Sequence, residues 1–355
     1  MNSKERVLAA VAHRETDRLP VFRPNTMDTT EPYDERVVRF LKSFEFDDFA
    51  GIGAGLPHPS ARREIALGVF EDGFGCRYQY KGVGLPYCVH SPLAAARTVD
   101  DIERYAWPEV DVAAPGRSDA RERAKATRAS GLRATNLGGC QLLHMVQYLR
   151  GFGQTFIDMK ADPDLFHAIA SRVHRINMAL LGASLDAVGE FADVVSFGDD
   201  FGGTTAPYVS LDDFRALLKP YYAEAFGAVK RRFSHAKVYL HSHGQIMNLV
   251  ADLVECGVDI LNPVLPLDHM DAARLKRDFG GRLTLQGCID IERIVPFGTL
   301  DQVERHVRDV IARLAPGGGF LFKLQVISPL VPPENVIRCY EIATLGKLSL
   351  CFDKD

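Results

Sequence analysis

Residues 237–261 read KVYLHSHGQIMNLVADLVECGVDIL, and this stretch decides the fold. Its first part, Lys237–Leu240, is a short strand-forming run, and Val258–Leu261 is a second one. Between them, the pattern of Gln245–Cys256 predicts a helix. A strand followed by a helix and another strand indicates two parallel strands joined by a crossover helix.

The same alternation runs through the chain from residue 132 onward. Further strands are predicted at Leu132–Asn136, Asp193–Phe197, Leu283–Gln286 and Phe320–Leu324. The other predicted helices are Gln141–Arg150, Asp164–Val188, one capped at Ser210, Asp271–Phe279, Thr299–Ala315 and one opening at Pro333. Six such units, with two weaker ones within residues 18–55, make eight. We therefore predict an α/β fold, a (β/α)8 TIM barrel with an N-terminal helical elaboration, rather than a doubly wound sheet.

The chain is predicted to form a single domain over residues 1–355, because no low-complexity linker divides it. Residues 1–130 form the irregular N-terminal part, and residues 131–346 contain the regular βα units. The irregular part is expected to hold an antiparallel excursion over residues 69–92 and three helices, at Ser3–His13, Tyr33–Phe44 and, with many charged residues, Ser118–Ser130.

The glycine-rich segment Gly51–Gly55 has the GxGxG spacing found in dinucleotide-binding loops. Such a loop must open a helix, whose N-terminus then holds the phosphates. Here the next residues are Leu56–Pro59, with the sequence LPHP, which does not start a helix of that kind. The segment is therefore not predicted to bind a nucleotide.

Composition places the chain among globular proteins. Of its 355 residues, 46% are apolar and 25% are charged, and the mean hydropathy is −0.06. A net charge of −4 argues against nucleic acid or an anionic membrane as a partner. Seven scattered cysteines without a CxxC pair are typical of a reducing compartment. With no signal peptide and no apolar run of roughly 18 residues, we expect a cytoplasmic protein.

The chemistry of a barrel enzyme lies at the carboxyl ends of its strands, so the polar residues at those ends are the candidates. Among them, His241 and His243 are two residues apart, and residues i and i+2 of an extended segment share a face. Two imidazoles on one face suit a divalent metal, most plausibly zinc. The alternative is that one ring stacks in the pocket while the other hydrogen-bonds a carbonyl.

Two further strand ends carry ionisable groups, and the sequence leaves two possible roles for each of them. Asp199 and Asp200 are adjacent, so in an extended chain they point opposite ways. One is expected to face the pocket as an acid, a base or a substrate-orienting group, and the other to cap or pair elsewhere. Cys288 is either a thiolate ligand or a small buried side chain.

Several motifs together resemble the uroporphyrinogen decarboxylase superfamily. They are Leu149–Gly153 (LRGFG), Asp199–Gly202 (DDFG), Glu255–Pro263 (ECGVDILNP), Gly287–Asp290 (GCID), Pro296–Thr299 (PFGT) and Pro332–Asn335 (PPEN). The resemblance implies a (β/α)8 barrel and one of two activities. One is the haem-pathway decarboxylase, which needs no metal or cofactor. The other is methyl transfer by zinc- and corrinoid-dependent enzymes.

This chain departs from the decarboxylase pattern at two places. The decarboxylase has an arginine-rich motif after its first strand to hold substrate carboxylates, whereas this chain offers Arg23 alone. The decarboxylase also has a histidine where this chain has Gln325. The thiol methyltransferases have His-x-Cys-Gly where this chain has His241 to Gly244, and a third ligand, cysteine, at Gln325. The resemblance thus implies zinc on His241 and His243, with Cys288, Asp200 or an unidentified residue as third ligand.

The sequence therefore predicts a corrinoid-dependent, O-demethylase-like methyltransferase. It would move a methyl group between a small methylated substrate and a corrinoid carrier protein. Catalytic roles are expected for Asp200, His241 and His243, and substrate contacts for Asn136, Asn262, Gln325 and Arg23. The alternative is a decarboxylase or other lyase on the same barrel, acting without corrinoid. A non-catalytic corrinoid binder is disfavoured because no DxHxxG motif is present. A homodimer is a further possibility that the sequence does not decide.

Overall fold

Eight parallel strands form the central sheet of the computed structural model, which describes residues 1–27, 31–82, 84, 86–113 and 117–344. Their hydrogen-bonded order is β1-β13-β12-β11-β10-β9-β8-β3, which is the chain order of a barrel. The strands are β1 (Val21–Phe22), β3 (Ala50–Ile52), β8 (Thr135–Gly138), β9 (Val194–Gly198), β10 (Lys237–His241), β11 (Ile260–Val264), β12 (Thr284–Cys288) and β13 (Phe320–Lys323). The predicted (β/α)8 fold is confirmed, and the two weak early units supply β1 and β3.

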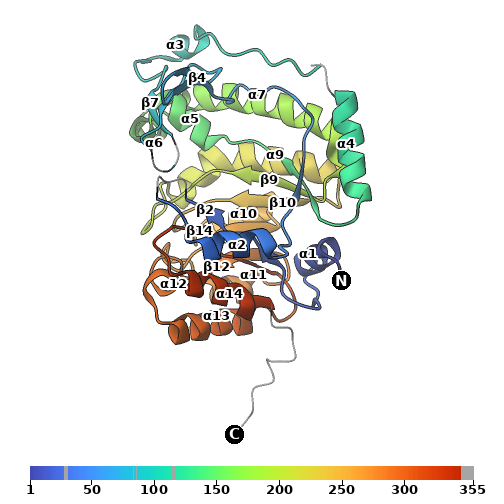
Figure 1. The fold of residues 1–355 in the computed structure, drawn as a ribbon. Coiled ribbons are helices and arrows are strands. Elements are labelled where there is room, and N and C mark those ends of the chain that lie inside the picture. Colours follow the sequence, from blue (N-terminus) through green and yellow to red (C-terminus); the bar gives the residue numbers. More distant parts are fainter. Residues whose placement is uncertain (28–30, 83, 85, 114–116, 345–355) are drawn as a thin grey trace.

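Helices follow the barrel strands and surround the sheet (Figure 1). They are α1 (Ser3–Val11), α2 (Glu35–Ser43), α3 (Val99–Glu103), α4 (Arg117–Ala129), α5 (Leu143–Arg150), α6 (Phe152–Ala161), α7 (Pro163–Val188), α8 (Leu211–Asp213), α9 (Lys219–Arg232), α10 (Val250–Cys256), α11 (Ala272–Phe279), α12 (Ile294–Phe297), α13 (Leu300–Leu314) and α14 (Pro333–Thr344). Short 3-10 and π-helical turns follow α7 and α8, at Gly189–Phe191 and Phe214–Leu218. In the described part of the chain, no helix is both long and apolar enough to cross a membrane.

The N-terminal part adds a small antiparallel sheet to the barrel. Its strands are β4 (Arg63–Ala66), β5 (Val69–Glu71), β6 (Arg77–Gln79) and β7 (Tyr87–His90). The predicted antiparallel excursion is thus confirmed, although it begins earlier than expected. In Figure 1 this sheet lies with α3, α5 and α6 at one end of the molecule, away from α13 and α14. A second small pair joins β2 (Asn25–Thr26) to β14 (Val326–Ile327).

One predicted helix is shorter than expected. The segment Gln245–Cys256 is helical only over α10. Gly244 has a φ of 98° and donates its N–H to the Asp268 carboxylate, and the Gln245 N–H donates to the Gly203 carbonyl. These contacts hold the first residues after β10 in a turn, so the helix starts five residues later than predicted, at Val250 rather than Gln245.

The barrel interior is apolar at its amino-terminal end and polar at its carboxyl end. Helix α1 closes the amino-terminal end, where its residues join a buried cluster with residues at the start of five strands or next to them, Phe22, Ala134, Val194, Ile260 and Leu321. Two residues further along their strands, period-two alternation directs Asn136, Asn262 and Lys323 to the same interior. The candidate chemistry therefore sits on top of a packed apolar layer.

A buried carboxylate joins the two ends of the strand order. Asp47, which is 1% exposed, lies between β1 and β3. Its N–H donates to the Val21 carbonyl at 2.7 Å, and its carboxylate accepts the Val21 N–H at 3.0 Å. Arg6 and Arg18 each place a guanidinium nitrogen 2.7 Å from the same carboxylate. Asp47 therefore supplies at this seam the hydrogen bonds that strands supply elsewhere in the barrel.

We predict that Asp47→Ala lowers the free energy of unfolding by about 3–5 kcal/mol, because it leaves two guanidinium groups without their buried partner. Chemical denaturation of the full chain measures this. The control is Asp278→Ala, whose ion pairs with Arg274 and Arg277 are exposed and should be worth less than about 1 kcal/mol. Equal losses in the two variants would show that Asp47 does not hold the seam.

Candidate active site

The two histidines lie side by side where β10 ends. The ring centroids of His241 and His243 are 5.0 Å apart and their planes meet at 74°. The prediction that these residues share one face is confirmed. The backbone leaves the strand at Gly244, where a Cβ would stand 2.0 Å from the Gly202 carbonyl oxygen. Only glycine fits this close approach, which brings the loops after β9 and β10 together.

Asp199 is a structural carboxylate. It is 1% exposed and accepts the backbone N–H groups of Leu142 and His144, each at 2.7 Å. The Tyr222 hydroxyl donates to it at 2.7 Å. Burial raises the pKa of Asp199. These bonds fix the start of α5, so the expectation that one of the two aspartates caps an element is confirmed for Asp199.

Asp200 faces the opposite way and lines a pocket. Its carboxylate accepts the backbone N–H of His243 at 2.7 Å, and its other oxygen lies 3.5 Å from Nε2 of His144. Burial by itself would raise the pKa of Asp200, but the bonds from these two histidines lower it to about 2. Asp200 is therefore an anion at any physiological pH.

His144 of α5 bridges the two aspartates, and the sequence analysis did not identify it. Its Nδ1 lies 3.5 Å from Asp199, and its Nε2 lies 3.5 Å from Asp200. Burial lowers the pKa of His144, but the two carboxylates outweigh burial and the net shift is upward. A signal was available, because His144 lies in the predicted helix that directly follows the strand end at Asn136.

A chain of side-chain hydrogen bonds orients His241. Nδ1 of His241 lies 2.7 Å from Oδ1 of Asn262, and Nδ2 of Asn262 donates to Oε1 of Gln325 at 3.0 Å. With Asn262 Oδ1 as acceptor, Nδ1 of His241 carries the proton and Nε2 is left as an acceptor. Burial lowers the pKa of His241, so its ring is neutral at neutral pH. Three residues predicted for the site are thus brought into one network.

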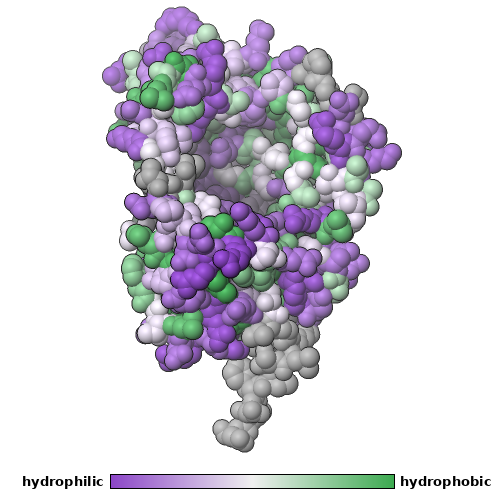
Figure 2. Space-filling model, in the orientation of Figure 1, coloured by the Kyte–Doolittle hydropathy of each residue, from purple (hydrophilic) through white to green (hydrophobic). Residues whose placement is uncertain are grey.

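The pocket beside this network is acidic. It has a volume of about 300 Å³ and is formed by the loops that follow β9 to β13. Asp200, Asp268 and Glu292 line it, together with His243 and Gln325. Among the described lining residues there is no lysine or arginine. The pocket thus presents three carboxylates to an incoming molecule. Figure 2 shows a hollow above α2 on the face turned toward the viewer.

Cys288 is not brought to this pocket, which corrects the expectation that it could be a ligand. Gly287 and Cys288 have φ values of 104° and 67°, so the alternation of side chains along β12 stops before Cys288. The side chain is 2% exposed and belongs to the main apolar cluster, which also contains Leu285. Burial raises the pKa of its thiol far above the ordinary value.

Arg23 does not line the pocket either. Its guanidinium stacks over the Phe46 ring at 4.6 Å, hydrogen-bonds the Leu41 carbonyl and lies 3.5 Å from Asp48. These partners engage the side chain outside the pocket, and the expected substrate contact stays a prediction. Asn136 lies inside the barrel, where its Oδ1 accepts the Ser196 hydroxyl at 2.7 Å. Its role toward substrate stays a prediction.

Lys323 is a second residue that the sequence analysis did not identify. It ends β13, and its Nζ lies 3.3 Å from Oδ1 of Asn25. Burial lowers the pKa of Lys323, although the charge of Asp48 opposes this, and its own charge depresses the pKa of His241. The signal was a single charged residue at the end of an otherwise apolar strand, Phe320–Leu324.

The described residues do not assemble a three-ligand metal site. Within the part of the chain that the structure describes, no group of three or more His, Cys, Asp or Glu side chains is placed to hold a metal ion. His241 and His243 supply two imidazoles, but Cys288 does not fit as the third ligand. The zinc stays a prediction.

The matching family model is that of uroporphyrinogen decarboxylase (URO-D), which covers residues 67–344. The chain belongs to this family. URO-D relatives include the uroporphyrinogen decarboxylase of Citrifermentans bemidjiense, 25% identical over 248 residues, which are 68% of each chain. Another is that of Coxiella burnetii strain Dugway 5J108-111, 26% identical over 198 residues, covering 53% of this chain and 50% of the relative.

A solved structure with the same fold is a methyltransferase from Methanosarcina mazei. It superposes with a TM-score of 0.64 at 20% sequence identity and covers 97% of this chain and 98% of that one. At this identity the likeness establishes the fold. The URO-D match and this superposition together confirm the predicted superfamily and its barrel.

We predict that His144→Gln destabilises the protein more at pH 5.5 than at pH 9. A histidine whose folded pKa is raised adds stability below its unfolded pKa, and this stability is lost as the pH rises through the folded value. The expected loss at low pH is about 1.5 kcal/mol, as for hydrogen bonds to charged groups. Urea unfolding at both pH values measures it.

The control for this test is His167→Gln. The His167 ring contacts the Tyr221 hydroxyl at 3.0 Å rather than a carboxylate. Its loss of stability should therefore be the same at both pH values. A loss at His144 that does not depend on pH would contradict the assignment of an imidazolium between Asp199 and Asp200.

Proposed function

We propose that this URO-D family member is a methyltransferase that moves a methyl group between a small methylated substrate and a corrinoid carrier protein. The observation that carries the proposal is the charge of the pocket. Asp200, Asp268 and Glu292 line it, and no described lysine or arginine does. This charge pattern favours a neutral or cationic substrate over one that carries several carboxylates.

The cost of misplaced charge explains why polycarboxylate substrates are disfavoured. A carboxylate brought from water next to other carboxylates loses hydration and gains only repulsion. A substrate with many carboxylates needs several cations to offset that cost. The expected cation, Arg23, is occupied by Phe46, Leu41 and Asp48. The chain therefore lacks, in its described pocket residues, the anion cradle that uroporphyrinogen would require.

The residues of the site are suited to holding a methylated group in place. Asp200 is ionised and can bind a cationic or polarised centre of the substrate. The Asn262–Gln325 pair fixes the ring orientation of His241, and His144 can store or return a proton beside Asp200. The corrinoid, held by its carrier, would supply the cobalt that accepts or donates the methyl group.

Two features support a partner docking at this end of the barrel. Tyr208 lines the pocket and is 38% exposed, and Phe152 is 54% exposed with its ring centroid 5.3 Å away. Exposed aromatic side chains of this kind are common at protein interfaces. For the reaction itself, the similar structure from Methanosarcina mazei is described as a methyltransferase, which supports the proposed class of reaction. A homodimer stays a prediction.

A decarboxylase or other lyase on the same barrel is the alternative. It is favoured by the relatives, which are named uroporphyrinogen decarboxylases at about 25% identity. In that case the ionised Asp200 would stabilise a protonated intermediate, and His144 would exchange the proton. The charge of the acidic pocket counts against this alternative for any substrate rich in carboxylates. The absence of Arg23 from the pocket's lining counts against it as well.

The deciding experiment follows methylation of cobalt by its visible absorbance. The full chain is mixed with a candidate corrinoid carrier protein, in reduced form, and with guaiacol, trimethylamine or tetramethylammonium as methyl donor. We expect turnover with at least one donor, orders of magnitude faster than with free cobalamin. We also expect Asp200→Asn to lower the rate about 100-fold, while Asp212→Asn on α8 leaves it unchanged. Conversion of uroporphyrinogen to coproporphyrinogen without corrinoid would instead establish the lyase.

Zinc is tested separately by elemental analysis. We predict that the chain, purified without chelator and supplied with zinc, holds about one ion, and that His243→Ala loses most of it while the fold survives. His167→Ala is the control, because His167 lies on α7 and contacts Tyr221. Wild-type protein with no stoichiometric zinc would remove the metal from the proposal and leave the acidic pocket as its basis.

A further inference from the structure

Asp268 is a buried carboxylate that opens into the acidic pocket. It is 6% exposed and lies in the loop after β11, which the Met270 N–H closes by donating to the Leu265 carbonyl at 3.3 Å. Oδ2 of Asp268 accepts the Gly244 N–H at 3.1 Å and lies 3.8 Å from Nδ1 of His243. Oδ1 has no hydrogen-bond donor among the described residues, and it is not one of the unpartnered atoms that the protein covers completely. This oxygen is therefore within reach of a molecule in the pocket that Asp268 lines.

The pocket combines its carboxylates with apolar walls. Leu265, which is 3% exposed, lines it together with Leu267 and Ile291. A metal cation or a primary ammonium gains little from such walls, because its ligands or its N–H donors require oxygen atoms. A cation that carries methyl groups gains from both parts of the lining. Its methyl carbons leave water beside the apolar side chains, while its charge meets the carboxylates.

An aromatic ring adds to the same lining. Tyr208 lines the pocket, and the rings of Phe152 and Phe156 pack against it with centroids 5.3 Å away in each case. The face of an aromatic ring attracts a cation, and proteins recognise quaternary ammonium ligands in this way. Toward a neutral methoxy compound, the same ring offers apolar contact without that attraction. The aromatic side chain therefore favours a methylated cation as well.

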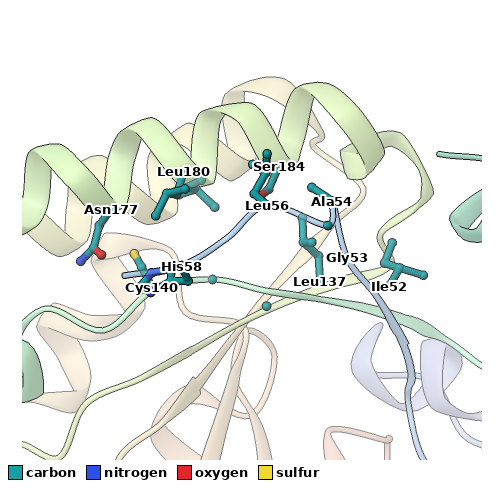
Figure 3. Close-up of a pocket in the computed structure, with 14 residues that line it drawn as sticks. Ile52, Gly53, Ala54, Leu56, His58, Leu137, Cys140, Asn177, Leu180 and Ser184 are labelled. Atoms are coloured by element: carbon teal, nitrogen blue, oxygen red, sulfur yellow. The ribbon is translucent and has the colours of Figure 1, made fainter. Parts of the chain in front are cut away.

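A second cavity shows that the acidic lining is not a general property of the fold. This cavity lies between α7 and the segments that follow β3 and β8, with Leu180 and Asn177 on its helix side (Figure 3). Its volume is about 290 Å³, close to the value of about 300 Å³ for the acidic pocket. Among its described lining residues there is no Asp, Glu, Lys or Arg. A cation would lose hydration there without gaining an ionic partner, so it is expected in the acidic pocket instead.

We propose that the methyl donor of the acidic pocket is a cation with methyl groups on nitrogen, a trimethylammonium or tetramethylammonium compound. Asp268 and the neighbouring carboxylates would meet its charge, and Tyr208 and Leu265 would contact its methyl groups. As a statement about the reaction, this inference rests on the proposed methyl transfer. The binding that it requires is measured without any corrinoid.

The change of charge during transfer also favours a nitrogen donor. The bond between nitrogen and one methyl carbon breaks, and its electron pair stays on nitrogen, so the donor leaves as a neutral amine without taking a proton. The methyl carbon bonds to the cobalt of the carrier's corrinoid, which supplies two electrons and is formally oxidised from Co(I) to Co(III). A methoxy donor would instead leave an anionic oxygen beside three carboxylates, where its charge meets repulsion.

The first test is isothermal titration calorimetry of the full chain with choline and with 3,3-dimethylbutan-1-ol. The two molecules have the same shape, but the alcohol has a carbon atom in place of the charged nitrogen. We expect choline to bind at least about 10-fold more tightly, as for an interaction with a charged group. Equal affinities for the two molecules, or no saturable binding of choline, would overturn the proposal.

Variants then locate the cation. Asp268→Asn keeps an oxygen for the Gly244 N–H but removes the charge, so choline should lose at least about 10-fold in affinity while the alcohol keeps its own. Glu292→Gln removes a charge from an exposed side chain of the same pocket, where water screens it, and should cost about 3-fold. Asp212→Asn on α8 is the control outside the pocket. Choline binding that is unchanged in both pocket variants would place the cation elsewhere and contradict the proposal.

A pair of substitutions tests the aromatic ring. Tyr208→Leu should weaken choline binding by about 3-fold, whereas Tyr208→Phe should leave it unchanged, because phenylalanine keeps the ring. The alcohol should bind both variants equally well. An equal loss of choline affinity in the two variants would show that the ring does not contact the cation.

Turnover separates this inference from the proposed function. In the cobalt methylation assay we expect tetramethylammonium to be a better donor than guaiacol. Turnover of guaiacol without turnover of tetramethylammonium would overturn the inference and leave the proposed methyl transfer standing. Selective binding of choline with no methyl transfer from any donor would overturn the proposed function and leave the site for a methylated cation in place.

Discussion

The carboxylate of Asp47 holds the two ends of the sheet together, and the rest of the barrel depends on this contact. Parallel strands satisfy each other along the sheet, but a barrel must also join its first and second strands. Here those strands are only two and three residues long, so they offer few backbone hydrogen bonds that could join them. One buried carboxylate takes the Val21 N–H and two guanidinium groups instead. Because closure relies on a charge, it also relies on Arg6 and Arg18 staying in place.

The same residue type performs opposite tasks at the site. Asp199 and Asp200 are neighbours in sequence. The Asp199 carboxylate accepts hydrogen bonds from two backbone N–H groups and from Tyr222, whereas Asp200 faces the pocket. Alternation along an extended segment explains the split. His144 links the two, so the carboxylate that fixes α5 also positions the imidazole that lowers the pKa of Asp200. Structure and candidate chemistry are coupled through one short segment.

Much of the barrel could be predicted from local pattern, because strands such as β9 and β13 are largely apolar runs and helices such as α8 and α13 begin at the capping residues Ser210 and Thr299. The pairing of His241 with His243 followed from period two for the same reason. Cys288 could not be placed, because its positive φ breaks that period. The partners of Arg23 could not be predicted either, since Leu41 and Phe46 come from the following helix and the turn beyond it. Contacts made across the fold decide such side chains, and no local spacing encodes them.

The distribution of charge between the two cavities limits what chemistry the fold can support. A family is defined by its barrel and its motifs, but the substrate meets only the side chains at the strand ends. Three carboxylates line the pocket beside His243, whereas the described lining of a second cavity, between α7 and the segments that follow β3 and β8, has no Asp, Glu, Lys or Arg. Neither environment stabilises several substrate carboxylates, because an anion needs compensating cations once water is removed. Membership of the URO-D family therefore fixes the scaffold of this chain, while the electrostatics of its own pockets argue for a substrate unlike uroporphyrinogen.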